Sequence, residues 1–174
     1  NLLGACYKAL GKLQASAKAF EAATTIKPDY AEAYNNLGIV QMQLRNLNDS
    51  AESFKRAIAI KPDYVEAHSN LGVVFKELNR LEDAVKIYEK VISFKPGYAE
   101  AHNNLGNLFK TLGMFNEAVK CYEKSLDIKP DYVEAHNNLG VVFKELNRLE
   151  DAVKSYEKAL SINPDFAEAH SNLG

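Results

Sequence analysis

The chain has 174 residues, of which 47% are hydrophobic and 25% charged, and its formal net charge is −2. This composition is too apolar for a disordered chain and close to the average of folded proteins. Two cysteines cannot build a disulfide framework, the apolar runs are far shorter than a membrane span, and a pI near 6.1 gives no basic surface for nucleic acid.

Prolines and glycines recur with a period of 34 residues. The prolines are Pro28, Pro62, Pro96, Pro130 and Pro164, and the glycines are Gly4, Gly38, Gly72, Gly106, Gly140 and Gly174. A period of this length is typical of repeat proteins. We therefore predict a single array over residues 1–174. It comprises a partial repeat (1–30), four full repeats (31–64, 65–98, 99–132 and 133–166) and the start of a further repeat (167–174).

Each repeat is expected to form two helices. In the repeat that begins near Asp131, apolar residues recur at helical spacing over 132–146 and again over 149–162, and Pro164 then prevents continuation. Asp131, followed three residues later by Glu134, predicts a side-chain cap at the first helix. The same pair recurs as Asp29/Glu32, Asp63/Glu66 and Asp165/Glu168. Gly97 replaces this aspartate once, and we expect that helix to begin less firmly.

The turn between the two helices also repeats. Asn147 occupies a position where the backbone after a helix often turns left-handed, and Gly11, Asn79 and Gly113 are its equivalents. Arg45 breaks this pattern, so Asn46 is expected to take over the role. Ser16 and Ser50 replace alanines of later repeats. Their hydroxyls need partners, most simply a carbonyl one turn back, which would make the first two repeats looser.

The pattern Leu139-Gly140, Phe143, Ala152, Tyr156, Ala159 and Pro164 resembles the tetratricopeptide repeat (TPR), a helix–turn–helix repeat of 34 residues. The resemblance covers the whole chain and implies an all-α fold, a right-handed superhelical solenoid whose first helices line a concave inner face. His68, His102, His136 and His170 stand, together with Tyr34, where the family often has tryptophan. We expect them to fill space between helices.

The free face of the first helices carries an asparagine ladder. Its candidate peptide-binding residues are Asn36, Asn70, Asn104, Asn138, Asn172, Asn103, Asn137 and Asn107, with Lys76, Lys110 and Lys144. An asparagine amide has donors and acceptors that match a peptide backbone of any sequence. Two interpretations stay open, namely contact with a ligand and bonding between neighbouring repeats. Ile39, Val73 and Val141 add an apolar stripe, which adjacent helices can also bury.

The array is most similar to those of protein O-GlcNAc transferases and related bacterial TPR proteins. That resemblance implies a scaffold that binds extended protein or peptide on its inner face. Alternatives are the substrate-recruiting segment of a larger glycosyltransferase, and an architectural array that self-associates through its uncapped ends. Glu32, Glu66, Glu100, Glu134 and Glu168 would repel the acidic tails that other TPR modules bind. The glutamates also disfavour nucleic acid as a partner, and no membrane partner is expected.

No pattern in the sequence predicts catalysis. The four histidines are 34 residues apart, so neighbouring rings lie about 10 Å from one another and cannot share a metal ion. We expect no catalytic residue, metal or cofactor in this segment, although a parent protein could be an enzyme. Cys6 and Cys121 lie on different repeats, which makes a disulfide between them improbable and favours a reducing, cytoplasmic location.

Overall fold

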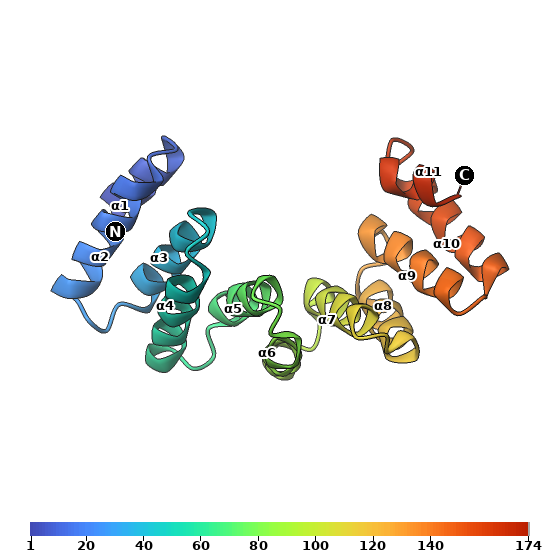
Figure 1. Ribbon diagram of the computed structural model, residues 1–174, viewed down its shortest axis with the longest axis horizontal. Helices are drawn as coiled ribbons and strands as arrows, with labels where there is room; N and C mark the ends of the chain where they lie inside the picture. Colours follow the sequence, from blue (N-terminus) through green and yellow to red (C-terminus); the bar gives the residue numbers. More distant parts are fainter. Residues whose placement is uncertain (174) are drawn as a thin grey trace. The chain divides into compact units, whose positions relative to one another are not determined.

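The structure is a computed structural model that describes residues 1–173, and all of its regular elements within that range are helices (Figure 1). Gly174, the last member of the glycine series, lies outside the described residues. The chain forms two compact units, the first being Asn1–Phe94 and the second beginning at Lys95. The first unit contains α1 (Leu2–Ala9), α2 (Leu13–Ile26), α3 (Ala31–Gln43), α4 (Leu47–Ile60), α5 (Val65–Glu77) and α6 (Leu81–Phe94). The second contains α7 (Ala99–Thr111), α8 (Phe115–Ile128), α9 (Val133–Glu145), α10 (Leu149–Ile162) and α11 (Ala167–Leu173).

Consecutive helices form hairpins. Within the first unit α3 packs on α4 and α5 packs on α6, and within the second α7 packs on α8 and α9 packs on α10. A first helix also packs on the second helix of the hairpin before it, as α3 does on α2 and α9 does on α8. The bounds of α9 and α10 agree with those expected from the sequence, because apolar periodicity and the proline define both helices.

Helices of one hairpin approach closely where the repeating glycine faces an aromatic ring. A Cβ atom added to Gly106 would lie 2.7 Å from the Tyr122 ring, and one added to Gly38 would lie 2.7 Å from the Phe54 ring. Real carbon atoms do not approach one another so closely without displacement. The ring sixteen residues after each glycine therefore fills the space that the missing side chain leaves.

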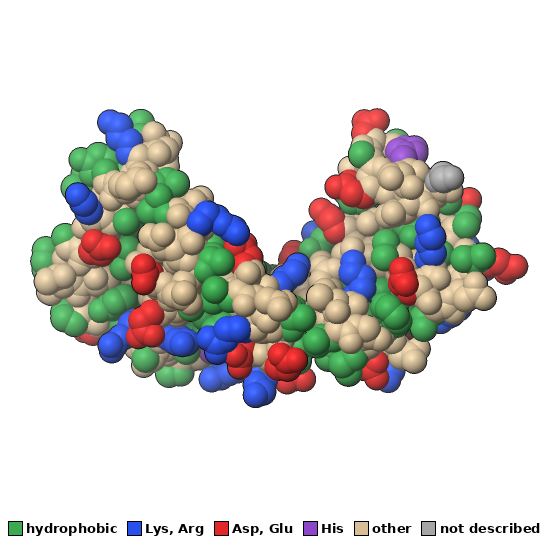
Figure 2. Space-filling view, in the orientation of Figure 1, with side chains coloured by type: hydrophobic (Ala, Val, Ile, Leu, Met, Phe, Trp, Pro, Cys, Tyr) green, Lys and Arg blue, Asp and Glu red, His purple; other side chains and the backbone are tan. Residues whose placement is uncertain are grey.

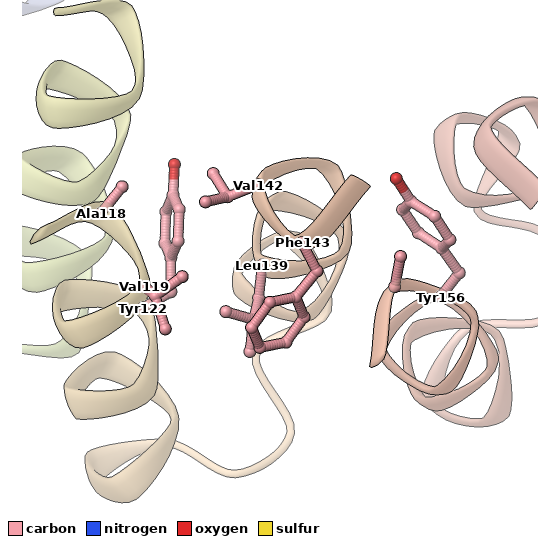
Figure 3. Close-up of a cluster of buried hydrophobic side chains, with 8 residues drawn as sticks. Ala118, Val119, Tyr122, Leu139, Val142, Phe143 and Tyr156 are labelled. Atoms are coloured by element: carbon pink, nitrogen blue, oxygen red, sulfur yellow. The ribbon is translucent and has the colours of Figure 1, made fainter. Parts of the chain in front are cut away.

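The core of the second unit is a cluster that joins three helices (Figure 3). The rings of Tyr122, from α8, and Tyr156, from α10, lie on opposite sides of α9. Leu139, Val142 and Phe143 of α9 are buried with them. Burial of such side chains stabilises a fold by about 1.5–3 kcal/mol each. Since a helix with one apolar face cannot bury it alone, the hairpins stabilise one another.

The core of the first unit includes the two serines that replace alanine. Ser16 and Ser50 are fully buried, and their hydroxyls donate to the carbonyl oxygens of Gly4, at 2.8 Å, and Gly38, at 2.7 Å. The expected partner, a carbonyl one turn back in the same helix, is therefore wrong. The glycine of the facing helix leaves its carbonyl uncovered, so the hydroxyl crosses the hairpin and ties its helices together.

Predicted caps at the first helices are also wrong. Tyr132, not Asp131, is the residue before α9, and no side chain caps this helix; α3 and α5 likewise follow Tyr30 and Tyr64. The preceding lysine, proline and aspartate instead form a tight turn, in which the Tyr132 N–H donates to the Lys129 carbonyl at 3.2 Å. Proline suits the second position of such a turn.

The turn before α7 has the same form. The Tyr98 N–H donates to the Lys95 carbonyl at 3.1 Å, and α7 begins after Tyr98. Because aspartate is not the cap in the other repeats, Gly97 removes no cap here. The expectation of a weaker start for this helix therefore loses its basis.

In every repeat the residue equivalent to Asn147 adopts the left-handed backbone conformation at the turn between the two helices. Asn79 and Asn147 have φ values of 56° and 57°, as expected, and Arg45 itself has a φ of 65°. The prediction that Asn46 takes over this role is wrong. The two flanking helices fix the register, since the Asn46 N–H still donates to the Gln41 carbonyl at 2.9 Å. Arg45 therefore accepts a conformation that costs about 1–2 kcal/mol.

Candidate functional site: the asparagine face

The first helix of each repeat presents one face that carries the predicted ladder, here called the asparagine face. Its rung asparagines are Asn36 and Asn70 in the first unit and Asn104, Asn138 and Asn172 in the second, and all five are half-buried. Charged side chains of both signs are mixed over the visible surface of each unit (Figure 2). The asparagine face is therefore distinguished by its amides rather than by a patch of one charge.

Rung asparagines bond to the preceding repeat. The Nδ2 group of Asn138 donates to the Oδ1 atom of Asn103 at 3.1 Å, and that of Asn172 donates to Asn137 at 2.9 Å. In the first unit Asn70 donates to Asn35 at 3.2 Å. The two partners are 35 residues apart in each case. Bonding between repeats, one of the two interpretations left open by the sequence, is thus a feature of the ladder.

The acceptors of these bonds are buried. Asn103 is 4% exposed and Asn137 is 8% exposed, although the helical periodicity of a single helix places them on the free face. The first helix of the next repeat covers them, as the contacts of α9 with α7 and α11 show. Asn103 and Asn137 are therefore held inside the stack and do not lie on its open surface.

Tyrosine hydroxyls take part in this network of amides in two repeats. Asn1 donates from Nδ2 to the Tyr30 hydroxyl at 2.9 Å, and the Asn103 side chain hydrogen-bonds the equivalent Tyr132. Burial, with smaller contributions from Glu134 and Glu100, raises the pKa of Tyr132 to about 12, so this phenol is neutral and keeps its proton for hydrogen bonding. The sequence signal for this network is the tyrosine that precedes α3, α5, α7 and α9, which the helical periodicity did not reveal; Phe166 takes its place before α11.

The side-chain amide of Asn107 forms a hydrogen bond within its own hairpin. Its Oδ1 atom accepts a hydrogen bond from the Tyr122 hydroxyl at 2.8 Å. In the next repeat Val141 replaces this asparagine, and the Tyr156 hydroxyl is buried without a partner among the described residues. Val141 itself packs against the buried cluster of the second unit. This position therefore serves packing first, and in Asn107 the Nδ2 group is the part of the amide left without a bond in its own hairpin.

Predicted lysines lie in the last turn of the first helices. Lys76 and Lys144 are exposed and Lys110 is half-buried. Beside Lys76, Glu77 forms an ion pair with Arg45 of the preceding hairpin at 2.7 Å. Lysine at a helix C-terminus is also favoured by the helix dipole, so its position alone does not imply a ligand.

The four histidines have a structural partner that the sequence did not suggest. Each Nε2 atom lies 2.8–3.0 Å from the carbonyl oxygen of the proline six residues earlier. A carbonyl only accepts, so Nε2 carries the proton and the ring secures the turn between repeats. His68 is the most buried at 1% exposure, and its Nδ1 atom has no partner among the described residues. Burial, assisted by Lys90, lowers its pKa, against the opposing effect of the bond to Pro62.

We expect acid to destabilise the protein through His68. Its pKa is about 6.5 in the unfolded chain and lower in the folded chain. Stability is therefore complete above pH 6.5 and falls as the pH drops toward the folded pKa, because the unfolded state takes up the proton first. Urea unfolding at several pH values between about 7.5 and 5 measures this loss. His68→Gln keeps a donor for Pro62 but cannot titrate, so it should flatten the dependence; an equal slope in both proteins would refute this assignment.

Residues 1–173 contain no group of side chains placed to hold a metal ion. Cys6 and Cys121 are both present as thiols and are not joined in a disulfide. None of the helices in this range has the length and apolar character that crossing a membrane requires.

Models of two repeat families match the chain. The tetratricopeptide repeat model matches residues 99–132 and 133–166, and the TPR repeat model matches residues 4–45, 42–79 and 74–113. No curated protein sequence matches the chain significantly.

Solved structures of TPR proteins share this fold. A crystal structure of MamA is 25% identical, with a TM-score of 0.88 over 95% of this chain and 97% of that chain. TTC0263, a thermophilic TPR protein of Thermus thermophilus, is 26% identical, with a TM-score of 0.76 over 98% of this chain and 93% of that one. YrrB, described as a TPR protein with an unusual peptide-binding site, is 20% identical with a TM-score of 0.80, over 97% and 87% of the two chains, and shows the fold alone.

These matches confirm the fold class expected from the sequence, an all-α solenoid of TPR hairpins. They also support protein or peptide partners. The chain belongs to the tetratricopeptide repeat family and is a scaffold for protein interactions.

Proposed function

We propose that the asparagine face binds polypeptide in an extended conformation, through the backbone of the bound chain. One observation carries this proposal. Asn70 and Asn138 are half-exposed and are each held by a hydrogen bond to the preceding repeat, yet that bond uses only one hydrogen of the amide. In the described part of the chain, the Oδ1 atoms of Asn70 and Asn138 have no hydrogen-bond partner.

The bond between repeats favours ligand binding rather than competing with it. A side-chain amide has two donor hydrogens and an acceptor oxygen with two lone pairs. Fixing one hydrogen on Asn103 leaves Asn138 an acceptor and a second donor in a defined orientation, which lowers the entropy lost on binding. A peptide backbone offers one donor and one acceptor per residue and so complements these groups.

The spacing of the rungs suits an extended strand. Packed helices lie about 8–10 Å apart, whereas an extended chain rises about 3.3 Å per residue. Successive rungs within one unit would then meet every third residue of the ligand. Such contacts read backbone rather than side chains, so the predicted preference is for extended conformation and not for one sequence.

The other predicted site residues have different roles in this proposal. Asn103 and Asn137 are positioning residues, because they are buried and orient the rung asparagines. Asn107 contributes only its Nδ2 group. Lys76, Lys110 and Lys144 flank the ladder at the C-terminal ends of the first helices and donate to backbone carbonyl groups of the ligand.

Asn70→Ala/Asn138→Ala tests the proposal. An array of unstructured twelve-residue peptides selects a binder, and fluorescence anisotropy then measures its affinity. Asn70 lies in the first unit and Asn138 in the second, so a peptide bound on either unit loses one contact. A lost hydrogen bond is worth about 0.5–1.5 kcal/mol, so the double variant should bind about 2- to 13-fold more weakly. Asn48→Ala/Asn116→Ala removes two exposed asparagines from second helices and should leave the affinity unchanged.

Asn103→Ala separates positioning from contact. It removes the acceptor of Asn138 while leaving the rung itself in place, so thermal stability should fall and affinity should decrease less than in the double variant. Unchanged affinity of Asn70→Ala/Asn138→Ala, with reduced thermal stability, would show that the ladder only joins repeats and would overturn the proposal.

A further inference from the structure

A hollow of about 750 Å³ opens on the asparagine face of the first unit, between α1, α2 and α3. Its volume is within the range of about 300–1,000 Å³ that is typical of ligand pockets. Ala5 and Ala9 of α1 form one wall, and Leu13 and the buried ring of Phe20 lie beneath them. The hollow is open to solvent, which suits a segment of polypeptide better than an enclosed small molecule.

Small residues in α1 account for the hollow. At the position of Ala5 the later repeats have Ile39, Val73, Asn107 and Val141, and at that of Ala9 they have Gln43, Glu77, Thr111 and Glu145. Only the first repeat has alanine at both. The ring beneath also lacks a hydroxyl, because phenylalanine stands at position 20, as it does at Phe54, whereas the three repeats that follow have Tyr88, Tyr122 and Tyr156. The accessible apolar surface of the hollow comes from Ala5, Ala9 and Leu13, and the buried Phe20 ring beneath them brings no hydroxyl to it.

The charge at the rim of the hollow is positive. Of the described residues that line the hollow, Lys8 alone is charged, and the side-chain amides of Asn36 and Gln43 lie on the wall formed by α3. The surrounding hairpin, Leu2–Ile26, has three lysines (Lys8, Lys12 and Lys18) and a single acidic residue, Glu21. A ligand with an apolar group and a neighbouring negative charge complements this surface.

We propose that this hollow anchors one bulky apolar side chain, such as leucine or phenylalanine, of a bound polypeptide that has an acidic residue next to it. The apolar group lies against Ala5, Ala9 and Leu13, above the buried Phe20 ring, and the carboxylate pairs with Lys8. The amides of Asn36 and Gln43 bond to the backbone on either side. This inference rests on the proposed function, because it adds a preference for one ligand side chain to a face that otherwise contacts only the ligand backbone.

Three amidated, fluorescein-labelled nonapeptides test the anchor on the full chain. They share a Ser/Thr-rich context and have Leu-Asp, Ala-Asp or Leu-Lys at the centre. We expect the Leu-Asp peptide to bind about tenfold more tightly than either of the others, as anisotropy titrations at low salt would measure. Ala5→Val/Ala9→Thr introduces residues found at equivalent positions of this chain and should remove the preference for leucine over alanine.

Lys8→Met tests the charge separately and needs no change in packing, because Met42 occupies the equivalent position. It should remove the preference for aspartate over lysine, whereas Lys12→Met, at an exposed residue outside the hollow, should preserve it. Equal binding of the three peptides to the unmodified protein, or unchanged preferences in both the Ala5→Val/Ala9→Thr and Lys8→Met variants, would overturn the anchor. If Asn70→Ala/Asn138→Ala still weakened binding of the array-selected peptide, the proposed function would stand without it.

Discussion

Phe54→Ala should lower the free energy of unfolding by about 3–5 kcal/mol, the range for aromatic residues truncated in a core. The Phe54 side chain is 0% exposed, and its ring lies over Gly38 of the facing helix. Because glycine has no side chain that could move into the space, the truncated ring leaves a void between α3 and α4. Urea unfolding followed by circular dichroism measures the loss.

Phe94→Ala is the matched control. Phe94 also lies on a second helix of the first unit, but it is 41% exposed and contacts the His68 ring at its margin, with ring centres 5.5 Å apart. Its truncation should cost less than half as much as that of Phe54. Similar costs for the two variants would contradict the view that burial over Gly38 makes the Phe54 ring a larger source of stability than an exposed ring.

Gly106→Ala should destabilise the second unit by about 1–3 kcal/mol, as overpacking does in other cores. The added Cβ atom would lie 2.7 Å from the Tyr122 ring. That ring is fully buried, and its hydroxyl is bonded to Asn107, so it cannot move aside. Helix propensity alone would make the alanine variant more stable by about 1 kcal/mol. A measured destabilisation would therefore identify the steric cost of the added methyl group.

Two further variants isolate this contact. Gly97→Ala places its Cβ atom in open space, with no atom within 4 Å, and should be nearly neutral. Gly106→Ala/Tyr122→Leu relieves the clash, so its cost should be smaller than the sum of the two single changes. Additive costs would mean that the helices accommodate the added methyl group without a clash with the Tyr122 ring.

Much of this protein could be predicted from local features of the sequence. Pro164 and the apolar periodicity define α10, and Asn147 marks the left-handed turn before it, because both properties depend on neighbours a few residues away. The wrong predictions involve partners that are distant in sequence or turns that local pattern does not reveal. Asp131 fits a cap locally, yet the turn that contains it determines where the helix begins, and Ser50 bonds across the hairpin rather than within its helix.

The period, the helices and the positions of the rung asparagines therefore follow from local sequence features. Which amides are exposed depends instead on how the helices pack. Asn137 and Asn138 are adjacent and chemically identical, but the next first helix covers one and leaves the other half-exposed. A helical wheel describes one helix, whereas burial depends on the helix packed against it. The hollow over Phe20 likewise exists because two alanines of α1 leave space between three helices at once.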